Sequence, residues 1–80
     1  MRKIQVTITN LAERVDGAVC GAQLAFKVRQ NGSVLISDFL TGKISGPYTR
    51  TYEVDASDSV LTVEHNRHDL PGLTITASLN

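Results

Sequence analysis

Residues 23–40 read QLAFKVRQ-NG-SVLISDFL and carry the clearest structural signal in the chain. In the first half of this segment, apolar and polar side chains alternate, which is typical of a β-strand with one buried face. Asn31 and Gly32 follow, and both tolerate the positive φ of a type I′ turn, so the chain is expected to reverse there. Residues 33–40 then return antiparallel, and the whole segment is predicted to be a β-hairpin.

A turn of two residues also predicts which side chains share a face. If Gln30 pairs with Ser33, Phe26 and Phe39 both lie on the buried face of the hairpin. The other face then carries three aliphatic side chains: Val34, Ile36 and Leu40. A bulge of one residue would turn over part of the second strand and bury these side chains instead.

An outward stripe of aliphatic side chains with charged neighbours has the composition of a protein interface. The predicted interface consists of Lys27, Arg29, Val34, Ile36 and Leu40. In the alternative interpretation, a loop of the same chain, or the side chain of Ile44, covers the aliphatic residues.

The same alternation recurs along the chain and predicts four further strands, at residues 3–9, 48–54, 59–65 and 73–79. The segment 10–21 is ambiguous. Residues 11–15 fit one helical turn with Asn10 as its N-cap, but they also fit a short strand at 13–15 followed by a tight turn at Asp16-Gly17. A seventh strand between Val15 and Cys20 is therefore an open alternative.

The apolar members of these alternating sets form the predicted core: Ile4, Val6, Ile8, Leu24, Phe26, Val28, Leu35, Phe39, Tyr52, Val54, Leu61, Val63, Leu73, Ile75 and Leu79. Six or seven short strands, each with one apolar face, predict an all-β fold. The favoured architecture is a small antiparallel β-sandwich, immunoglobulin-like or fibronectin-like at the level of the fold, with a small barrel as second choice. Residues 1–80 are expected to form one domain.

Composition and charge exclude several classes of protein. The chain has 80 residues, is 41% hydrophobic and has no net charge, which argues against disorder. No basic run with interleaved aromatics exists, so nucleic acid is not an expected partner. Residues 1–50 carry seven basic and three acidic side chains, a balance of +4, while residues 51–80 carry one basic and five acidic, a balance of −4.

No apolar stretch approaches the roughly 20 residues that span a bilayer, and the N-terminal residues alternate instead of forming a continuous apolar segment. Neither a membrane partner nor a signal peptide is therefore expected. The sequence indicates synthesis in the cytoplasm, with a virion as the final location by analogy alone.

Residues with reactive side chains do not form a recognisable catalytic or metal-binding pattern. His65 and His68 precede Asp69 in what reads as a polar turn, and Cys20 is distant from them in sequence. The loop that contains Gly42 and Gly46 lacks the spacing of a phosphate-binding loop. The oxygen-rich segment 55–59 lacks EF-hand spacing. The sequence predicts a protein that is not an enzyme and uses no metal or cofactor.

The leading hypothesis is a non-enzymatic assembly module that packs against copies of itself, as a homo-oligomer, or against a larger protein scaffold. Virion decoration proteins and appendage subunits exemplify this class. The alternative is a ligand-recognition module that binds a carbohydrate or a peptide through the end loops at residues 42–47 and 66–72.

Overall fold

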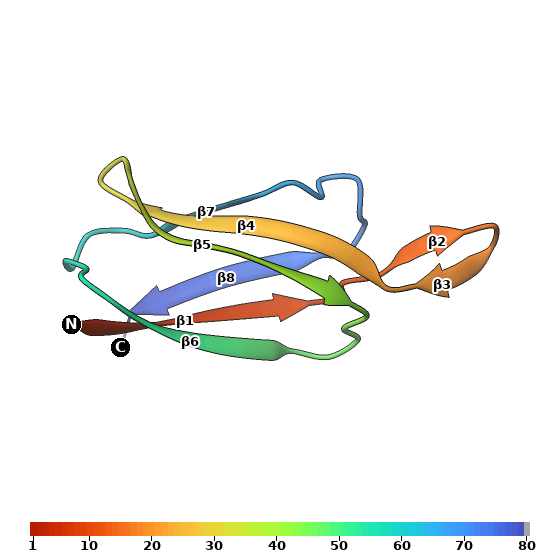
Figure 1. Cartoon of the computed structure of the whole chain (residues 1–80), viewed down its shortest axis with the longest axis horizontal. Helices are drawn as coiled ribbons and strands as arrows, with labels where there is room; N and C mark the ends of the chain where they lie inside the picture. The colour runs from red at the N-terminus through yellow and green to blue at the C-terminus, as the bar shows by residue number, and fades with distance from the viewer. Residues whose placement is uncertain (80) are drawn as a thin grey trace.

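The computed structural model describes residues 1–79 and consists of β-strands, turns and loops. Figure 1 shows the eight strands in order: β1 (Arg2–Thr9), β2 (Glu13–Val15), β3 (Ala18–Cys20), β4 (Ala22–Gln30), β5 (Ser33–Gly42), β6 (Tyr48–Val54), β7 (Thr62–His65) and β8 (Thr74–Leu79). All paired strands run antiparallel. They form two three-stranded sheets, β6-β1-β8 and β5-β4-β7, and the two-stranded sheet β2-β3. The predicted all-β class is therefore confirmed, and in residues 1–79 these sheets do not close into a barrel.

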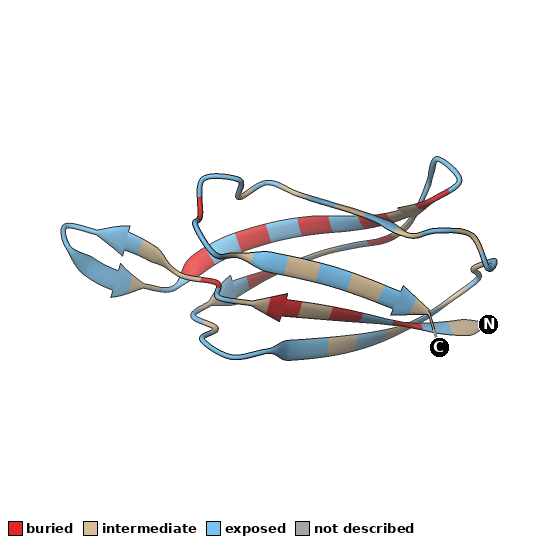
Figure 2. Cartoon of the chain, turned by 180° about the vertical axis from the view of Figure 1, so that it is seen from behind, coloured by how far each residue is buried: buried red, intermediate tan, exposed pale blue. Residues whose placement is uncertain are grey.

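Buried side chains of both three-stranded sheets belong to one hydrophobic core. Every second residue of β1 and of β4 is buried, and Figure 2 shows these positions as alternating bands. The largest side chains without exposed surface come from both sheets: Phe26, Ile4, Ile8, Leu11, Leu24, Val6 and Val28. The central strand of each sheet thus supplies most of the core.

The bounds of the predicted strands agree closely with the structure, with one exception. Residues 48–54 form β6 as expected, and β1 and β8 differ from the prediction by one residue each. The strand predicted at 59–65 is reduced to Thr62–His65. Its expected first residues belong instead to a loop that the side chain of Gln30 holds.

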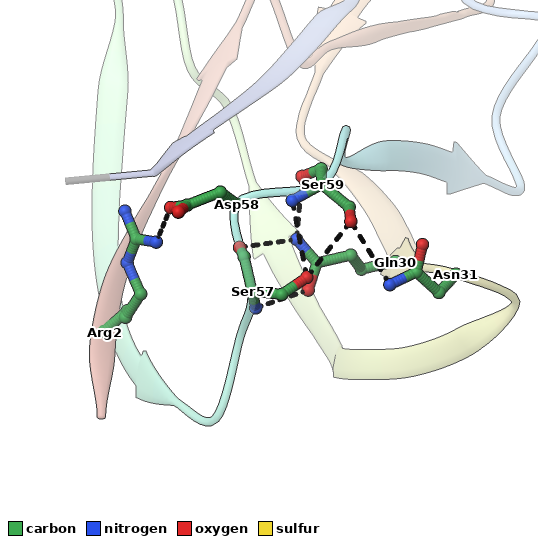
Figure 3. Close-up of polar contacts among 6 residues, drawn as sticks. All are labelled: Arg2, Gln30, Asn31, Ser57, Asp58 and Ser59. Carbon is green, nitrogen blue, oxygen red and sulfur yellow. Dashed lines mark hydrogen bonds and ion pairs between the residues drawn. The ribbon is translucent and has the colours of Figure 1, made fainter.

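Within residues 1–79, Gln30 is the one polar residue among the buried residues, and it anchors the loop between β6 and β7. Its Nε2 donates to the carbonyl oxygens of Ser57 (2.9 Å) and Ser59 (2.7 Å), and its Oε1 accepts from the backbone N–H of Ser57 (2.8 Å). Figure 3 shows these bonds beside the ion pair of Arg2 with Asp58. The side chain replaces the neighbouring strand that this segment would otherwise need for its backbone hydrogen bonds.

The ambiguous segment 10–21 forms a second hairpin, so the helical turn considered for residues 11–15 is wrong. Asp16 (φ 52°) and Gly17 (φ 81°) adopt nearly the same left-handed conformations as Asn31 (φ 53°) and Gly32 (φ 81°). Both hairpins therefore reverse through a turn that has positive φ at its two central residues. The β2-β3 hairpin projects beyond the end of the two facing sheets (Figure 1).

A bulge in β5 overturns the predicted faces of the first hairpin. The predicted pairing holds only near the turn, where Gln30 pairs with Ser33 and Arg29 with Val34. Val28 then pairs with Ile36, so Leu35 is an extra residue without a partner on β4.

Beyond the bulge, β5 presents the opposite face to that expected. The outward positions predicted for Ile36 and Leu40 are wrong, because these side chains are 5% and 8% exposed and belong to the core. The burial predicted for Phe39 is also wrong, since this residue is 72% exposed. The inversion exchanges one aromatic side chain for two aliphatic ones in the core and brings Asp38 to the inner side.

Most of the other predicted core residues lie where expected. The six expected from β1 and β4 are buried. Eight others are partly buried and pack against them: Leu35, Tyr52, Val54, Leu61, Val63, Leu73, Ile75 and Leu79. Leu11, Ala22 and Leu70 complete the core without having been predicted.

A search of residues 1–79 for a membrane-spanning helix of sufficient length and hydropathy finds none.

Candidate functional site

The outward surface of β4 and β5 is the part of the molecule that carries the predicted interface. Residues of β4 between its buried positions face outward, and their partners on β5 face the same way. We call this surface the hairpin face and define it by Ala25, Lys27, Arg29, Val34, Ser37 and Phe39.

Phe39 is the largest apolar side chain of the hairpin face, and it is 72% exposed. It pairs with Ala25, whose methyl group is too small to cover the ring. Two shallow hollows adjoin Ala25. One, of about 300 Å³, extends past Lys27 to Glu64, and the other, of about 290 Å³, is lined by Phe39 and extends to Thr41. The ring therefore lies beside a surface hollow that side chains of a partner can fill.

Charged groups lie further along β4 and on the neighbouring strand β7. Arg29 of β4 forms an ion pair with Glu64 of β7, and the hydrogen bond from the guanidinium lowers the pKa of the Glu64 carboxyl. Lys27 pairs with Glu64 in the strand register, is exposed and makes no ion pair within residues 1–79. The hairpin face thus has an apolar part at Phe39 and a charged part at Lys27, Arg29 and Glu64.

The structure brings together three of the five residues predicted for the interface. Lys27, Arg29 and Val34 lie on the hairpin face, and Val34 is 44% exposed. Ile36 and Leu40 do not, because the bulge in β5 turns their side chains into the core. Phe39 takes their place on the hairpin face. The sequence does not identify it in the regular register, but the alternative of a one-residue bulge predicts this exchange.

Asp38 forms a polar link between the two facing sheets. Its Oδ2 accepts hydrogen bonds from the Tyr52 hydroxyl (2.7 Å) and from Nη1 of Arg50 (2.9 Å), which both belong to β6. The Tyr52 bond, followed by contributions from the Phe39 backbone and Arg50, lowers the pKa of Asp38 against the opposing effect of burial. Burial, with the bond to Asp38, raises the pKa of Tyr52. The cluster joins β5 to β6 at one edge of the core.

Arg50 is held in this cluster from a second side. Its Nε donates to the Tyr48 hydroxyl (3.3 Å), and its guanidinium carbon lies 5.6 Å from the centroid of the Tyr48 ring. Tyr48 therefore positions the arginine that neutralises Asp38, and Tyr52 binds the same carboxylate.

The two histidines stack on each other, with their ring centroids 4.3 Å apart. Nδ1 of His65 accepts the backbone N–H of Arg67 (3.1 Å), and burial together with the neighbouring His68 lowers the pKa of His65. The adjacent carboxylate of Asp69 is bound by Arg67. Within residues 1–79, no three His, Cys, Asp or Glu side chains are grouped so as to hold a metal ion.

The two end loops lie together at the end of the molecule from which the β2-β3 hairpin projects (Figure 1). They enclose a hollow of about 560 Å³, which we call the end pocket. Six of its lining residues come from the loops: Lys43, Ile44, Ser45, Asp69, Leu70 and Pro71. Others, including Arg14 and Val19, come from the β2-β3 hairpin.

Comparison of the chain with known protein families, with curated proteins and with solved structures finds no match. The geometry of the hairpin face and of the end pocket therefore supplies the argument for function.

Proposed function

We propose that this protein is a non-enzymatic assembly module that packs, through its hairpin face, against copies of itself or against a larger protein scaffold. The observation that carries the proposal is the exposure of Phe39 in the middle of a regular strand. Burying a phenylalanine side chain is worth about 1.5–3 kcal/mol, which a partner surface gains on contact.

The surroundings of Phe39 support an interface. Interfaces typically have a few large apolar anchors, often aromatic, surrounded by polar groups that keep water from the centre. Here the ring lines a hollow of about 290 Å³, and a second hollow, which shares Ala25 with it, is lined by Lys27, Arg29 and Glu64. A complementary patch on another molecule would find both an anchor and polar contacts.

The proposed architecture is a β-sandwich of the immunoglobulin-like or fibronectin-like kind. Its support is the single core between β6-β1-β8 and β5-β4-β7. By analogy at the level of the fold, the setting that we propose is a larger structure in which the module packs repeatedly, such as a virion or an appendage.

Sedimentation equilibrium on wild type and Phe39→Asp tests the proposal. We expect the wild type to self-associate and the variant to sediment as a folded monomer, with circular dichroism as the folding control. Val60→Asp is the matched control, because Val60 is 84% exposed in the loop between β6 and β7 and lies outside the hairpin face. A wild type that stays monomeric at every concentration contradicts packing between copies.

A second candidate function is supported by the end pocket. Ligand pockets commonly measure about 300–1,000 Å³, and the two loops proposed to bind a carbohydrate or a peptide meet around a hollow of about 560 Å³. In this alternative the protein recognises a ligand at one end of the molecule.

A further inference from the structure

We propose that the end pocket binds an extended acidic segment of a partner protein, which lies along the β2-β3 hairpin and places an apolar side chain among Val19, Ile44 and Leu70. This inference rests on the second candidate function, ligand recognition by the end loops, and names the chemistry of its ligand.

The pocket offers an apolar surface on which a side chain can rest. Leu70 is buried beneath it, Ile44 is partly buried, and Val19 is 46% exposed on the hairpin wall. The backbone N–H of Ile44 donates to the carbonyl of Leu11 (2.8 Å), which fixes the loop that carries this side chain. An apolar group of a ligand would cover surface that water now contacts.

The charges that remain available at the pocket are positive. Arg14 and Lys43 line it, are exposed and form no ion pair within residues 1–79. The two lining carboxylates, Glu13 and Asp69, are both bound by Arg67, at 2.6 Å and 3.1 Å. Arg67, Arg14 and Lys43 carry three positive charges against these two carboxylates, so the groups at the pocket sum to +1. The two that form no ion pair within residues 1–79 are Arg14 and Lys43.

The same arginine makes the pocket rigid before a ligand arrives. Besides its two ion pairs, Arg67 donates from Nη1 to the carbonyl of Gln23 (3.0 Å), so it joins the loop to β2 and to β4. Nδ2 of Asn10 donates to the carbonyl of Gly72 (3.2 Å) at the other end of that loop. A preformed site loses less conformational entropy on binding.

The hairpin favours an extended peptide over a compact molecule. In residues 1–79, β2 and β3 pair only with each other, so the outer edge of each strand has backbone groups without a strand partner. An extended segment can satisfy these groups by strand addition while its alternate side chains enter the pocket. Carboxylates on that segment would meet Arg14 and Lys43.

Amide NMR titration of the full chain tests this inference with a capped seven-residue peptide that alternates glutamate and valine. Its controls are the matched lysine-valine peptide and inorganic phosphate. We expect the glutamate peptide to shift the amide signals of Val19, Ile44 and Leu70 saturably. Raising the salt concentration should weaken this binding, because exposed charges are screened.

Two double variants with the same change in net charge test the role of the cations. Arg14→Glu with Lys43→Glu should raise the dissociation constant about tenfold or more, the size of one lost charge-assisted contact. Arg2→Glu with Lys3→Glu alters cations that line neither the pocket nor the hairpin face and should bind as the wild type does, apart from a small effect of net charge.

The outcomes separate the inference from the function on which it rests. Equal binding of the lysine peptide, or equal weakening in the two double variants, overturns the acidic peptide as ligand. Phosphate that shifts the pocket signals as well as the peptide overturns the inference but leaves ligand recognition standing. Pocket signals that move with protein concentration alone identify a second copy as the occupant, which also overturns it. No shift with any probe at millimolar concentration overturns the inference and contradicts peptide recognition at the end pocket.

Discussion

The side-chain amide of Gln30 binds the main chain of Ser57 through both of its polar atoms. Its Oε1 accepts the N–H of Ser57 and its Nε2 donates to the carbonyl of the same residue. This reciprocal pair has the form of two residues that exchange hydrogen bonds across an antiparallel sheet. Gln30 is 5% exposed, so the pair lies at the margin of the core and leaves water little access.

Gln30→Glu should destabilise the fold by about 2–4 kcal/mol at pH 7, because a carboxylate oxygen would replace a donor that faces two carbonyl groups. Burial beside these carbonyls raises the folded-state pKa of the introduced carboxyl above its unfolded value. The penalty should therefore be smallest below the unfolded pKa of about 4.3 and should grow as the pH rises through the folded one. Urea unfolding of wild type and variant at pH 4 and pH 7 measures the loss of stability and its dependence on pH.

The control for this prediction is Asn31→Asp, which makes the same amide-to-carboxylate change at an exposed position. Asn31 makes only an exposed contact of 3.4 Å with the Ser59 hydroxyl, and aspartate also tolerates its left-handed conformation, so the free energy of unfolding should change by less than about 0.5 kcal/mol. A penalty in Gln30→Glu that does not depend on pH would show that the carboxylate has found other partners.

Asp38 should contribute stability that disappears in acid. Its hydrogen bond from Tyr52 and its contact with Arg50 lower its pKa in the folded state. A carboxyl with a depressed folded pKa stabilises the fold above its unfolded value of about 3.9, and this contribution is lost as the pH falls through the folded pKa. Asp38→Asn should cost about 1–3 kcal/mol at pH 7 and much less near pH 2, measured by urea unfolding.

Two variants distinguish the source of that effect. Tyr52→Phe removes the hydrogen bond to Asp38 and should cost about 0.5–1.5 kcal/mol at pH 7. Glu64 and Asp69 also have lowered pKa values, so the acid sensitivity that remains in Asp38→Asn belongs to such exposed groups. If Asp38→Asn lost as much stability at pH 2 as at pH 7, its cost would not come from the carboxylate charge.

Truncation of the two phenylalanines should lower the stability of the fold by very different amounts. Phe26 is 2% exposed at the centre of the core, and Phe26→Ala should lower the free energy of unfolding by about 3–5 kcal/mol. Phe39→Ala removes an exposed ring and should cost less than about 1 kcal/mol in the monomer. Denaturant titration of dilute protein measures both, and similar losses would mean that Phe39 is covered within its own chain.

Aspartate substitutions on β5 should locate the bulge. Ile36→Asp places a charge in the core and should abolish folding or cost more than about 4 kcal/mol. Val34→Asp precedes the extra residue, faces outward and should leave a folded chain. Circular dichroism and thermal unfolding distinguish the two, and tolerance of Ile36→Asp would indicate a regular hairpin without the bulge.

The turn of the first hairpin could be predicted because its signal is local. Asn31 and Gly32 are residue types that tolerate left-handed backbone conformations, and the positive φ values of both residues match that expectation. The alternation in β1, β4 and β6 likewise needs no knowledge of distant partners. For this reason the predicted face of each of these strands agrees with the structure.

The bulge could not be decided in the same way, because Val34, Leu35 and Ile36 are three apolar residues in succession and suit either register. What favours the observed register comes from outside the hairpin. Asp38 meets its partners Arg50 and Tyr52 on the inner side, and that contact depends on how β5 approaches β6. The residues predicted for the interface depend on this register. For that reason the structure has Phe39 on the hairpin face instead of Ile36 and Leu40.

The extra residue in β5 makes this strand unequally tolerant of deletions. Loss of Leu35 would leave Val34 followed directly by Ile36, so the strand would pair regularly and every later side chain would keep its face. Loss of Ser37 would also remove the extra residue, but Leu35 would then take the inward place opposite Val28, and Ile36 would turn outward opposite Lys27. Natural length variation in this hairpin should therefore concentrate at one position, where the chain holds a single spare residue.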